Sequence, residues 1–309
     1  MPKLSLPFHN NHSSSTRHGD GDGPFNAAVE PQGGAVKNHF VAASSEVVEP
    51  RSGAVKNRFV VKNHFVAASG EFVGTILFLY FAFATHLMAV EQADAVALAN
   101  GRKSAQTVVY ISLGYGFSLL VAVWAFYRIS GGLFNPAVTL GLCLAGKLPW
   151  TRGIIFLPTQ LLAGIVAAGL VSCMFPGDIR AVNTTLSPTT SVKQGFFIEM
   201  FLTCELTFTV LMLAVEKSKD TFLAPVGVGL ALFVTQLAGV YYTGASVNPT
   251  RSFGPSVAGT WFPGYHWIYW VGPFLGAAVS AGYYRFIKYF NYEEANPGQD
   301  SATSNLTVN

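Results

Sequence analysis

The stretch Thr243-Gly-Ala-Ser-Val-Asn248-Pro249-Thr250-Arg251 decides the fold of this chain, because it begins a helix inside a segment that is otherwise apolar. Asparagine caps the first turn of a helix, and proline is favoured at the first helical position, where its missing N–H is no loss. The same device stands at Ser130-Gly-Gly-Leu-Phe-Asn135-Pro136-Ala137. Both copies fit the pattern Ser/Thr-Gly-x-x-x-Asn-Pro, so the sequence predicts two short helices in corresponding positions of a duplicated chain.

The composition is that of a membrane protein that crosses the bilayer several times. The chain has 309 residues, of which 50% are hydrophobic and only 11% are charged. A water-soluble chain of this size has too little interior to bury so much apolar surface. Because basic residues lie mostly on the expected loops, the net charge of +3 does not indicate a nucleic-acid partner.

Three cysteines, Cys143, Cys173 and Cys204, stand singly in apolar surroundings. Their spacing indicates neither a disulfide nor a metal site, so we interpret them as small core residues. The sequence also lacks a recognisable pairing of a nucleophile with a base. We therefore expect no catalytic residue, no metal, no cofactor and no enzymatic activity.

Six apolar runs are long enough to cross about 30 Å of hydrocarbon as helices. They lie at about 71–91, 106–127, 151–174, 195–215, 221–242 and 265–290. The segments with the Asn-Pro pairs, 130–146 and 244–262, are too short to cross and return, and we interpret them as re-entrant loops that each carry a half-helix. The predicted fold is an all-α membrane protein with six transmembrane helices and two re-entrant half-helices, built as an inverted repeat (about 66–174 and 195–292). Half-helices in corresponding positions of two repeats indicate a transport site.

The expected membrane domain, residues 66–292, lies between two tails. Residues 1–65 form the expected disordered amino-terminal tail, in which the segment from Val36 to Ser44 recurs at Val61 to Ser69. This repeat is either a duplication in a tolerant tail or a basic turn at the membrane surface. Residues 293–309 form the expected carboxy-terminal tail. Basic residues concentrate on the flanks that share a side with the termini, so the positive-inside rule predicts both termini in the cytoplasm.

Each repeat also begins with an acidic residue inside an apolar run, in Glu71-x-x-x-Thr75 and in Glu199-x-x-x-Thr203. An ionisable residue within a membrane helix is a candidate functional residue. One interpretation is a proton relay. The other, which we favour, is that each carboxylate accepts hydrogen bonds from backbone N–H groups of the nearby re-entrant loop, which needs partners at membrane depth.

These features resemble the aquaporin, or major intrinsic protein, family over about 66–292. Within it the chain looks most like the fungal water channels, through Phe126-Tyr-Arg-Ile-Ser-Gly-Gly-Leu-Phe-Asn-Pro-Ala-Val and Tyr241-Tyr-Thr-Gly. The resemblance implies a right-handed bundle of six tilted helices around one pore, assembled as a homotetramer in a lipid bilayer, here the plasma membrane. It also implies that Asn135 and Asn248 donate hydrogen bonds to a passing water. The positive ends of both half-helices would then repel cations, and the orientation of that water would interrupt proton hopping.

By the same resemblance, the narrow selectivity filter maps onto Tyr115, Gln236, Ala245 and Arg251. Family members that pass only water usually carry Phe at the first and His at the second of these positions, and Ala at the position of Thr250. The changes keep the filter polar, and glutamine is longer and more flexible than histidine. We therefore expect water and hydrogen peroxide to pass, with little glycerol. Since Gln236 is neutral at every pH, we expect no titration of the flux near neutral pH.

Two alternative functions remain open. A broader channel for small neutral solutes such as glycerol or carbon dioxide is disfavoured by Ser252, where glycerol channels typically carry Asp, and by the pair Tyr269-Trp270. A non-conducting junction or scaffold protein would predict a degenerate pore, whereas both asparagines and Arg251 are present.

Regulation and modification also remain open. Residues 1–79 contain no tyrosine that would plug the inner mouth, and Ser218, between two lysines, is a candidate phosphorylation site. Asn183 begins an Asn-Thr-Thr triplet in an expected outer loop, where it is either a used or an unused glycosylation site.

Overall fold

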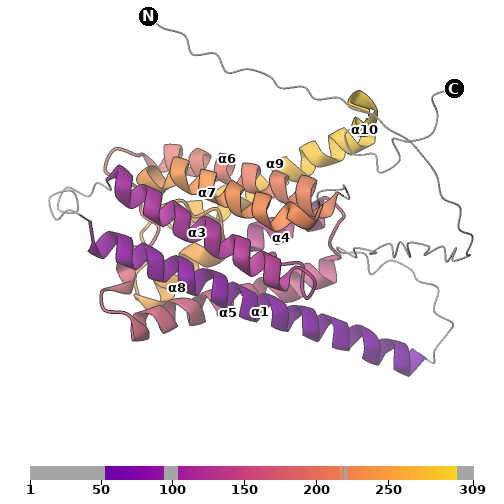
Figure 1. Cartoon of the computed structure of the whole chain (residues 1–309), viewed down its shortest axis with the longest axis horizontal. Coiled ribbons are helices and arrows are strands. Elements are labelled where there is room, and N and C mark those ends of the chain that lie inside the picture. The colour runs from indigo at the N-terminus through magenta and orange to yellow at the C-terminus, as the bar shows by residue number, and fades with distance from the viewer. Residues whose placement is uncertain (1–52, 94–103, 217, 219–220, 298–309) are drawn as a thin grey trace, which may run out of the picture. The chain divides into compact units, whose positions relative to one another are not determined.

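The computed structural model describes residues 53–93, 104–216, 218 and 221–297, and every regular element in these residues is a helix (Figure 1). The long helices are α1 (Gly53–Glu91), α3 (Ala105–Phe126), α5 (Trp150–Met174), α6 (Val192–Val210), α7 (Ala224–Thr243) and α9 (Ile268–Tyr289). Two short helices, α4 (Pro136–Leu144) and α8 (Pro249–Ala258), begin at the Asn-Pro pairs. The other elements are η1 (Ile179–Val182), the π-helical turn η2 (Leu211–Val215), η3 (Thr221–Leu223) and α10 (Tyr292–Ala295). The predicted all-α architecture of six long and two short helices is confirmed.

Helix α9 differs in composition from the other predicted spans. Within the described residues, five helical segments are long and apolar enough to cross a membrane: Val60–Glu91, Ala105–Phe126, Trp150–Met174, Val192–Val215 and Thr221–Thr243. Helix α9 has 22 residues, as many as α3, but tyrosine, tryptophan, glycine and proline lower its hydropathy. Its glycines allow close packing against α6, since a Cβ atom on Gly272 would lie 3.0 Å from the carbonyl oxygen of Phe196. The sixth long helix is therefore recognised by its length and packing rather than by its hydropathy.

Helix α1 is longer than the sequence predicts. It begins at Gly53 and contains 39 residues, or about 58 Å of helix, about twice the thickness of the hydrocarbon layer. Its first turns extend past the neighbouring helices, and Val61 and Phe65 are exposed there (Figure 1). Residues 53–65, which the sequence analysis assigned to the amino-terminal tail, belong to this helix in the structure. Residues 1–52, with the first copy of the repeat, and 298–309 lie outside the described residues.

The inverted repeat is visible where α3 crosses α7. Gly116 and Gly229 meet at this crossing, and each stands nineteen residues before the asparagine of its own repeat. A Cβ atom on Gly229 would lie 2.8 Å from the carbonyl oxygen of Gly116, and one on Gly116 would lie 3.0 Å from that of Gly229. Membrane helices approach closely through such small residues, because lipid offers no hydrophobic drive for their association. The two repeats therefore pack against each other through equivalent positions.

Half-helix α8 packs equally closely against α5. A Cβ atom on Gly254 would overlap the carbonyl group of Gly164. A Cβ atom on Gly164 would overlap the γ-methyl of Thr250 and lie 3.0 Å from that residue's carbonyl oxygen. The threonine that follows Asn-Pro in the second repeat is thus accommodated because the facing residue of α5 is glycine.

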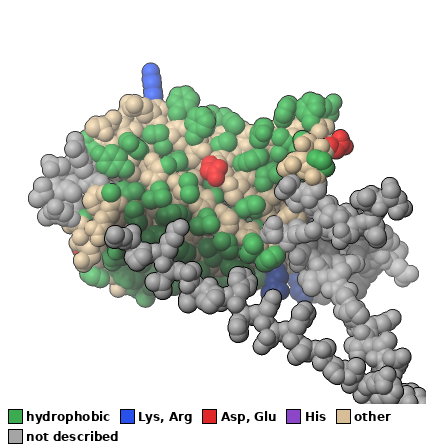
Figure 2. Space-filling model, turned by 45° about the horizontal axis from the view of Figure 1, so that its top comes forward, with side chains coloured by type: hydrophobic (Ala, Val, Ile, Leu, Met, Phe, Trp, Pro, Cys, Tyr) green, Lys and Arg blue, Asp and Glu red, His purple; other side chains and the backbone are tan. Residues whose placement is uncertain are grey.

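The outer surface of the helices is apolar. Figure 2 shows a face on which hydrophobic side chains predominate and charged ones are few. Large exposed side chains include Phe81, Phe117, Trp124, Ile154 and Phe201. A surface of this composition is suited to lipid rather than to water.

The Gly164 position provides a test of this packing. Gly164→Ala should lower the free energy of unfolding in detergent by about 1–3 kcal/mol, because the new methyl group overlaps Thr250 and overpacks the contact between α5 and α8. Gly169→Ala, in the same helix but with no atom within 4 Å of the new Cβ, should be neutral or slightly stabilising. Thermal unfolding of the purified variants measures both. Equal stability of the two alanine variants would contradict the packing argument.

Candidate functional site

The loops that precede α4 and α8 share one unusual backbone conformation. Positive φ values occur at Gly131 (104°), Gly132 (66°) and Phe134 (51°) in the first loop and at Gly244 (79°), Ala245 (45°) and Val247 (55°) in the second. These positions stand four, three and one residues before the asparagine of each loop. A left-handed conformation costs about 1–3 kcal/mol in a residue other than glycine. Surrounding groups must therefore hold both loops in place.

Each asparagine caps its own half-helix. The Oδ1 atom of Asn135 accepts a hydrogen bond from the backbone N–H of Ala137 at 2.8 Å, and that of Asn248 accepts one from Thr250 at 2.9 Å. The proline after each asparagine occupies the first helical turn. The side-chain oxygen is therefore fixed, and the NH2 group points away from the helix.

Each asparagine also bonds to the opposite loop. The Nδ2 atom of Asn135 donates to the carbonyl oxygen of Val247 at 2.8 Å, and that of Asn248 donates to the carbonyl oxygen of Phe134 at 2.9 Å. The amino ends of α4 and α8 therefore meet, with the positive ends of both helix dipoles toward the same region. A carboxamide has two N–H groups, so one N–H of each asparagine is left to donate into the cavity that both side chains line.

A buried carboxylate from α1 supports the first loop. Glu71 is 0% exposed and accepts hydrogen bonds from the backbone N–H groups of Leu133 at 3.0 Å and Phe134 at 2.8 Å. The side-chain amide of Gln160 donates to it at 2.8 Å. The residue with positive φ nearest Asn135 is thereby tied to a transmembrane helix.

A second carboxylate, from α6, supports the second loop in the same way. Glu199 accepts hydrogen bonds from the backbone N–H groups of Ser246 and Val247, both at 2.9 Å, and from the hydroxyl of Thr243 at 2.6 Å. This is the geometry expected of a loop-supporting carboxylate. A proton relay along the pore would need a carboxylate in its wall, and neither Glu71 nor Glu199 is among the residues that line the cavity.

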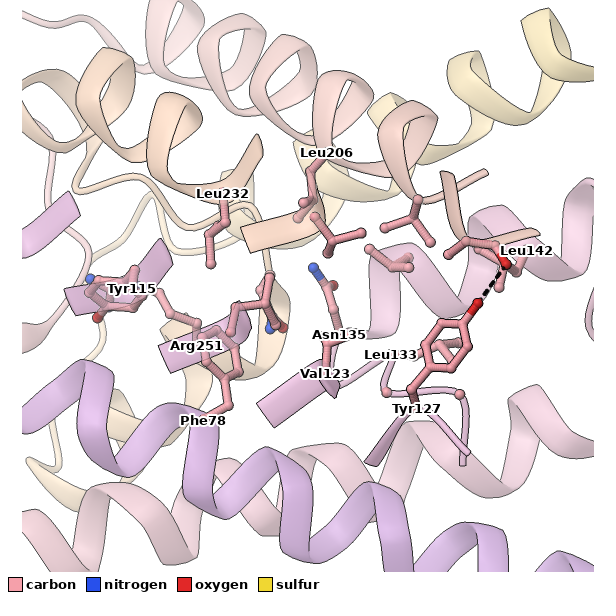
Figure 3. A pocket seen from close by; sticks show the side chains of 18 of the residues that line it. Phe78, Tyr115, Val123, Tyr127, Leu133, Asn135, Leu142, Leu206, Leu232 and Arg251 are labelled. Carbon is pink, nitrogen blue, oxygen red and sulfur yellow. Dashed lines mark hydrogen bonds between the residues drawn. The ribbon is translucent and has the colours of Figure 1, made fainter. Parts of the chain in front are cut away.

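One cavity runs past both asparagines (Figure 3). Arg251 and Tyr115 lie toward one end of it, Tyr127 lies at the other end, and Asn135 lies between them. The hydroxyl of Tyr127 donates to the carbonyl oxygen of Ala214 at 3.1 Å. Most of the wall is apolar: Phe78, Leu119, Val123, Leu133, Val138, Leu142, Leu206, Val210, Val228 and Leu232.

Arg251 is the main polar group at its end of the cavity and is only 1% exposed. Its Nη1 atom donates to the carbonyl oxygen of Val182 at 2.7 Å, and Nη2 donates to that of Gly244 at 3.4 Å. The guanidinium carbon lies 4.9 Å from the centre of the Tyr115 ring, a cation–π distance. In the described part of the chain, no carboxylate forms an ion pair with Arg251, and its Nε atom has no hydrogen-bond partner. Carbonyl dipoles and an aromatic ring therefore stabilise this charge.

A residue that the sequence analysis did not assign, His86 of α1, stands beside Arg251. Its Nδ1 atom lies 3.3 Å from Nη2 of Arg251 and 3.4 Å from the hydroxyl of Tyr115, and the side chain is 0% exposed. The expectation that the flux does not titrate near neutral pH was drawn from Gln236 alone, and it stays a prediction. One signal in the sequence could have found His86: it is an ionisable residue in an apolar run.

Gln236 directs its amide toward the second loop. Its Nε2 atom donates to the carbonyl oxygen of Ala245 at 3.0 Å, and its Oε1 atom has no partner within the described residues. Tyr115, Gln236 and Arg251 line the cavity together, as the resemblance implies, whereas Ala245 is not among the lining residues. The methyl group of Ala245 instead lies against α7, 3.0 Å from the position of a Cβ on Gly239. All four residues are 1% exposed or less, so the cavity is narrow at this end.

The segment that supplies the carbonyl group of Val182 is fixed to α8 by side chains. The hydroxyl of Thr184 donates to Ser252 at 2.9 Å, and that of Ser252 donates to Ser246 at 2.6 Å. Ser252 thus joins the segment after η1 to the second loop. Asn183 is only 2% exposed, so the folded chain does not present its amide for glycosylation.

The segment that follows α6 and η2 is held by an ion-pair network around Glu216. Its carboxylate accepts hydrogen bonds from Tyr284 and, at 3.1 Å, from Lys288, and Lys147 lies 3.6 Å away. Burial raises the pKa of Glu216, but the hydrogen bonds from Tyr284 and Lys288 and the charges of both lysines outweigh burial and lower it. The network fixes the segment before Ser218. The lysines on either side of Ser218, Lys217 and Lys219, lie outside the described residues.

The cysteines take no part in this site. Cys143 is buried, Cys173 is exposed and Cys204 is half-buried, and all three are free thiols outside the cavity lining. Among the described residues, no three His, Cys, Asp or Glu side chains gather in a group that would hold a metal ion.

Comparison with known proteins identifies fungal relatives. Residues 59–284 match the family model described as major intrinsic protein. The chain is 63% identical over 232 residues to "Probable aquaporin-3" of Gibberella zeae. The aligned residues cover 75% of this chain and 81% of that protein. It is 56% identical over 234 residues to "Aquaporin-7" of Botryotinia fuckeliana, covering 75% of this chain and 51% of that one. In fold it is similar to the solved structure of the aquaglyceroporin from Plasmodium falciparum, with a TM-score of 0.61, 23% identity, and coverage of 72% of this chain and 95% of the other.

The carboxylates that support the loops can be tested by removing their charge. Glu71→Gln should lower the free energy of unfolding by at least about 3 kcal/mol, because an amide NH2 then faces backbone donors that lose a charged acceptor. Glu91→Gln, at an exposed position of the same helix, serves as the matched control and should change stability little. Thermal unfolding in detergent and osmotic permeability in liposomes measure the effect. A Glu71→Gln protein as stable and permeable as the parent would contradict the supporting role.

Proposed function

Because the chain belongs to the major intrinsic protein family, a family of membrane channels, we propose that it is a passive water channel. One observation carries the proposal: the amides of Asn135 and Asn248 lie at the junction of two half-helices, and both line one cavity. Each amide has an N–H available for the oxygen of a passing water. The apolar wall on either side offers few competing partners, so water moves on without being bound tightly.

The same junction accounts for proton exclusion. A water that accepts hydrogen bonds from both asparagines has its oxygen at the junction and its own hydrogens directed outward along the pore. A proton cannot hop through a file whose waters point away from one central molecule. The positive ends of the α4 and α8 dipoles face the same point and add an electrostatic barrier to hydronium and other cations.

The filter end adds a fixed charge and a set of hydrogen-bonding groups. Arg251 has an Nε–H without a partner in the described chain, and Gln236 has an Oε1 acceptor in the same condition. A molecule that both donates and accepts hydrogen bonds can replace its hydration here, whereas a cation meets the guanidinium charge. Water satisfies this pairing, and so does hydrogen peroxide, which is similar to water in cross-section. We therefore include peroxide among the proposed permeants.

A broader channel for small neutral solutes is the second candidate. The mostly apolar wall between the filter and Tyr127 supports it, since the carbon backbone of glycerol needs such a surface. The filter argues against it, because Tyr115, Gln236 and Arg251 are all 1% exposed or less and leave little width for a three-carbon molecule. A non-conducting scaffold is less well supported, since both asparagines and the arginine line the cavity.

The proposal includes the orientation and location of the channel. Lys147, Arg152, Arg285 and Lys288 flank the helices at the end of α6 that carries Glu216. At the other end of α6, the described basic residues are Arg180, which pairs with Asp178, and Lys193. This asymmetry supports cytoplasmic termini by the positive-inside rule. We propose the plasma membrane as the location.

Solute fluxes through the purified protein test the proposal. In stopped-flow experiments on proteoliposomes, the protein should raise water and peroxide permeability well above that of empty liposomes, with a low activation energy and no proton leak. Glycerol uptake should stay near the level of empty liposomes. Gln236→His should reduce peroxide flux more than water flux, because the imidazole is more rigid than the amide of glutamine.

Each other outcome has a distinct meaning. Folded protein with the water permeability of empty liposomes would reject the channel proposal and favour a scaffold. Rapid glycerol uptake would favour the broader channel. Equal peroxide flux in the parent and in Gln236→His would reject the part assigned to Gln236.

We infer that the channel assembles as a homotetramer, and Glu205 of α6 supports this inference. Its side chain is exposed on the outside of the helix, where Thr209 donates a hydrogen bond to it at 3.2 Å. A carboxylate that faces lipid at membrane depth is costly, so a neighbouring protein surface is expected to cover it. The groove between α1 and α3, with Thr85 and Ser118 among apolar residues, offers polar partners on a second copy.

The assembly can be tested at this residue. Native mass spectrometry of the protein in detergent should give four chains for the parent and fewer for Glu205→Arg, because the larger basic side chain disrupts the contact. The same change at an exposed site near the end of α9, Tyr289→Arg, should leave four chains. A parent that is monomeric in lipid-preserving detergent, or a Glu205→Arg protein that remains tetrameric, would contradict the inference.

A further inference from the structure

We propose that His86 is a positioning residue of the filter: its neutral imidazole holds the Arg251 guanidinium in place, and protonation from the outer side releases it and lowers water permeability. The proposal rests on the channel function proposed above. It adds a residue of α1 to a filter otherwise built from α3, α7, α8 and the second loop. It also adds a pH response that the four residues expected from the sequence would not give.

The contact with Arg251 indicates which nitrogen of the neutral His86 ring accepts a hydrogen bond. The Nδ1 atom lies 3.3 Å from Nη2 of Arg251, which is a donor at every accessible pH. Nδ1 must therefore be the acceptor and carry a lone pair, so the neutral ring has its proton on Nε2. The hydroxyl of Tyr115, 3.4 Å from the same Nδ1, lies on the other side of this contact. His86, Tyr115 and Arg251 thus form one buried cluster at the narrow end of the cavity.

His86 completes the set of acceptors that orient Arg251. The guanidinium donates to the carbonyl oxygens of Val182 in η1 and Gly244 in the second loop, and to His86 in α1. These acceptors come from segments far apart in the sequence, so together they fix the plane of the guanidinium rather than only its position. His86 is the one side chain among them, and it alone changes its hydrogen-bonding character with pH.

Protonation reverses the contact between the two residues. An imidazolium has an N–H on both nitrogens and no acceptor, so Nδ1–H would face an N–H of Arg251. Two positive charges would then lie at hydrogen-bonding distance in a buried place, where repulsion is poorly screened. The guanidinium is the more mobile partner, because it stands at the end of a long side chain, and it would move toward the cavity. A displaced cation in a narrow passage obstructs water.

The ionisable groups that the described residues place around His86 can be named element by element, and residues 94–103 lie outside this description. Of the elements packed around His86, α8 presents Arg251 and α3 presents Tyr115. Beside η1, Arg180 and Asp178 pair with each other at the surface. Helix α5 carries its one charged residue, Arg152, in its first turn at the opposite end. On α1 itself, the next ionisable residue is Glu91, which is exposed.

Three variants test the proposal in proteoliposomes between about pH 7.5 and about pH 5, on either side of the usual titration range of histidine. His86→Asn places an Oδ1 acceptor near the position of Nδ1 but does not titrate. His86→Leu keeps a similar volume without an acceptor. His266→Asn is the matched control, since His266 is a half-buried histidine in the segment before α9 whose pKa is lowered by burial.

The expected results form a distinct pattern. Water permeability of the parent should fall several-fold on acidification. His86→Asn should lose the response and conduct more water than His86→Leu at both pH values, because it keeps an acceptor for Arg251. The water permeability of His86→Leu should be low at both pH values and should not respond to pH. In this variant Arg251 always lacks the acceptor that protonation of His86 removes in the parent. His266→Asn should respond as the parent does.

Other results would overturn the proposal. If the parent conducts water equally well or faster at acid pH, the role proposed for His86 is wrong, but the channel function still holds. If the parent conducts no water at neutral pH, the channel function itself is wrong. A pH response that persists in His86→Asn, or that disappears in His266→Asn, would assign the response to another group. If His86→Leu fails to fold, the comparison of the parent with His86→Asn still decides the question.

Discussion

A backbone N–H without a partner is costly in hydrocarbon, and the whole site depends on two carboxylates that remove this cost. The loops before α4 and α8 are not helical, and each holds residues with positive φ at membrane depth. Glu71 and Glu199 accept the N–H groups that the helical ladder cannot reach. Because the loops are held in this way, Asn135 and Asn248 can bond across to each other's loop and present their remaining N–H groups to the cavity.

The duplication provides a symmetric frame, and side-chain changes make it asymmetric. Gln236 stands twelve residues before its asparagine and Arg251 three after, and the equivalent positions of the first repeat are Val123 and Val138. Both valines line the cavity. One end of the pore therefore carries a charge and hydrogen-bonding groups, while the equivalent positions at the other end are apolar. Selection at a single point, followed by an apolar passage, is compatible with both discrimination and rapid flow.

The sequence predicts the frame well because each of its parts is encoded locally. The Asn-Pro pairs, the apolar runs and the Glu-x-x-x-Thr pairs all depend on residues close together in the chain, and the structure places the corresponding helices as expected. The parts that could not be predicted depend on contacts between distant segments. His86 reaches Arg251 across 165 positions, and the carbonyl group of Val182 has no side-chain signature at all. The side of the loop that Ala245 presents follows from its positive φ, which the sequence does not reveal in a residue other than glycine.

These contacts change how selectivity should be interpreted in this channel. When selectivity is interpreted from four positions alone, Arg251 counts as a fixed charge, and its neighbours set the width of the opening. Here the orientation of the guanidinium depends on acceptors in η1, the second loop and α1 as well as on the ring of Tyr115. Two chains with the same four residues but different residues at position 86 would therefore hold this guanidinium differently. The amide of Gln236 bonds to the carbonyl group of Ala245 and does not contact Arg251 by a hydrogen bond. The imidazole of His86, from α1, is the side chain that accepts from the guanidinium.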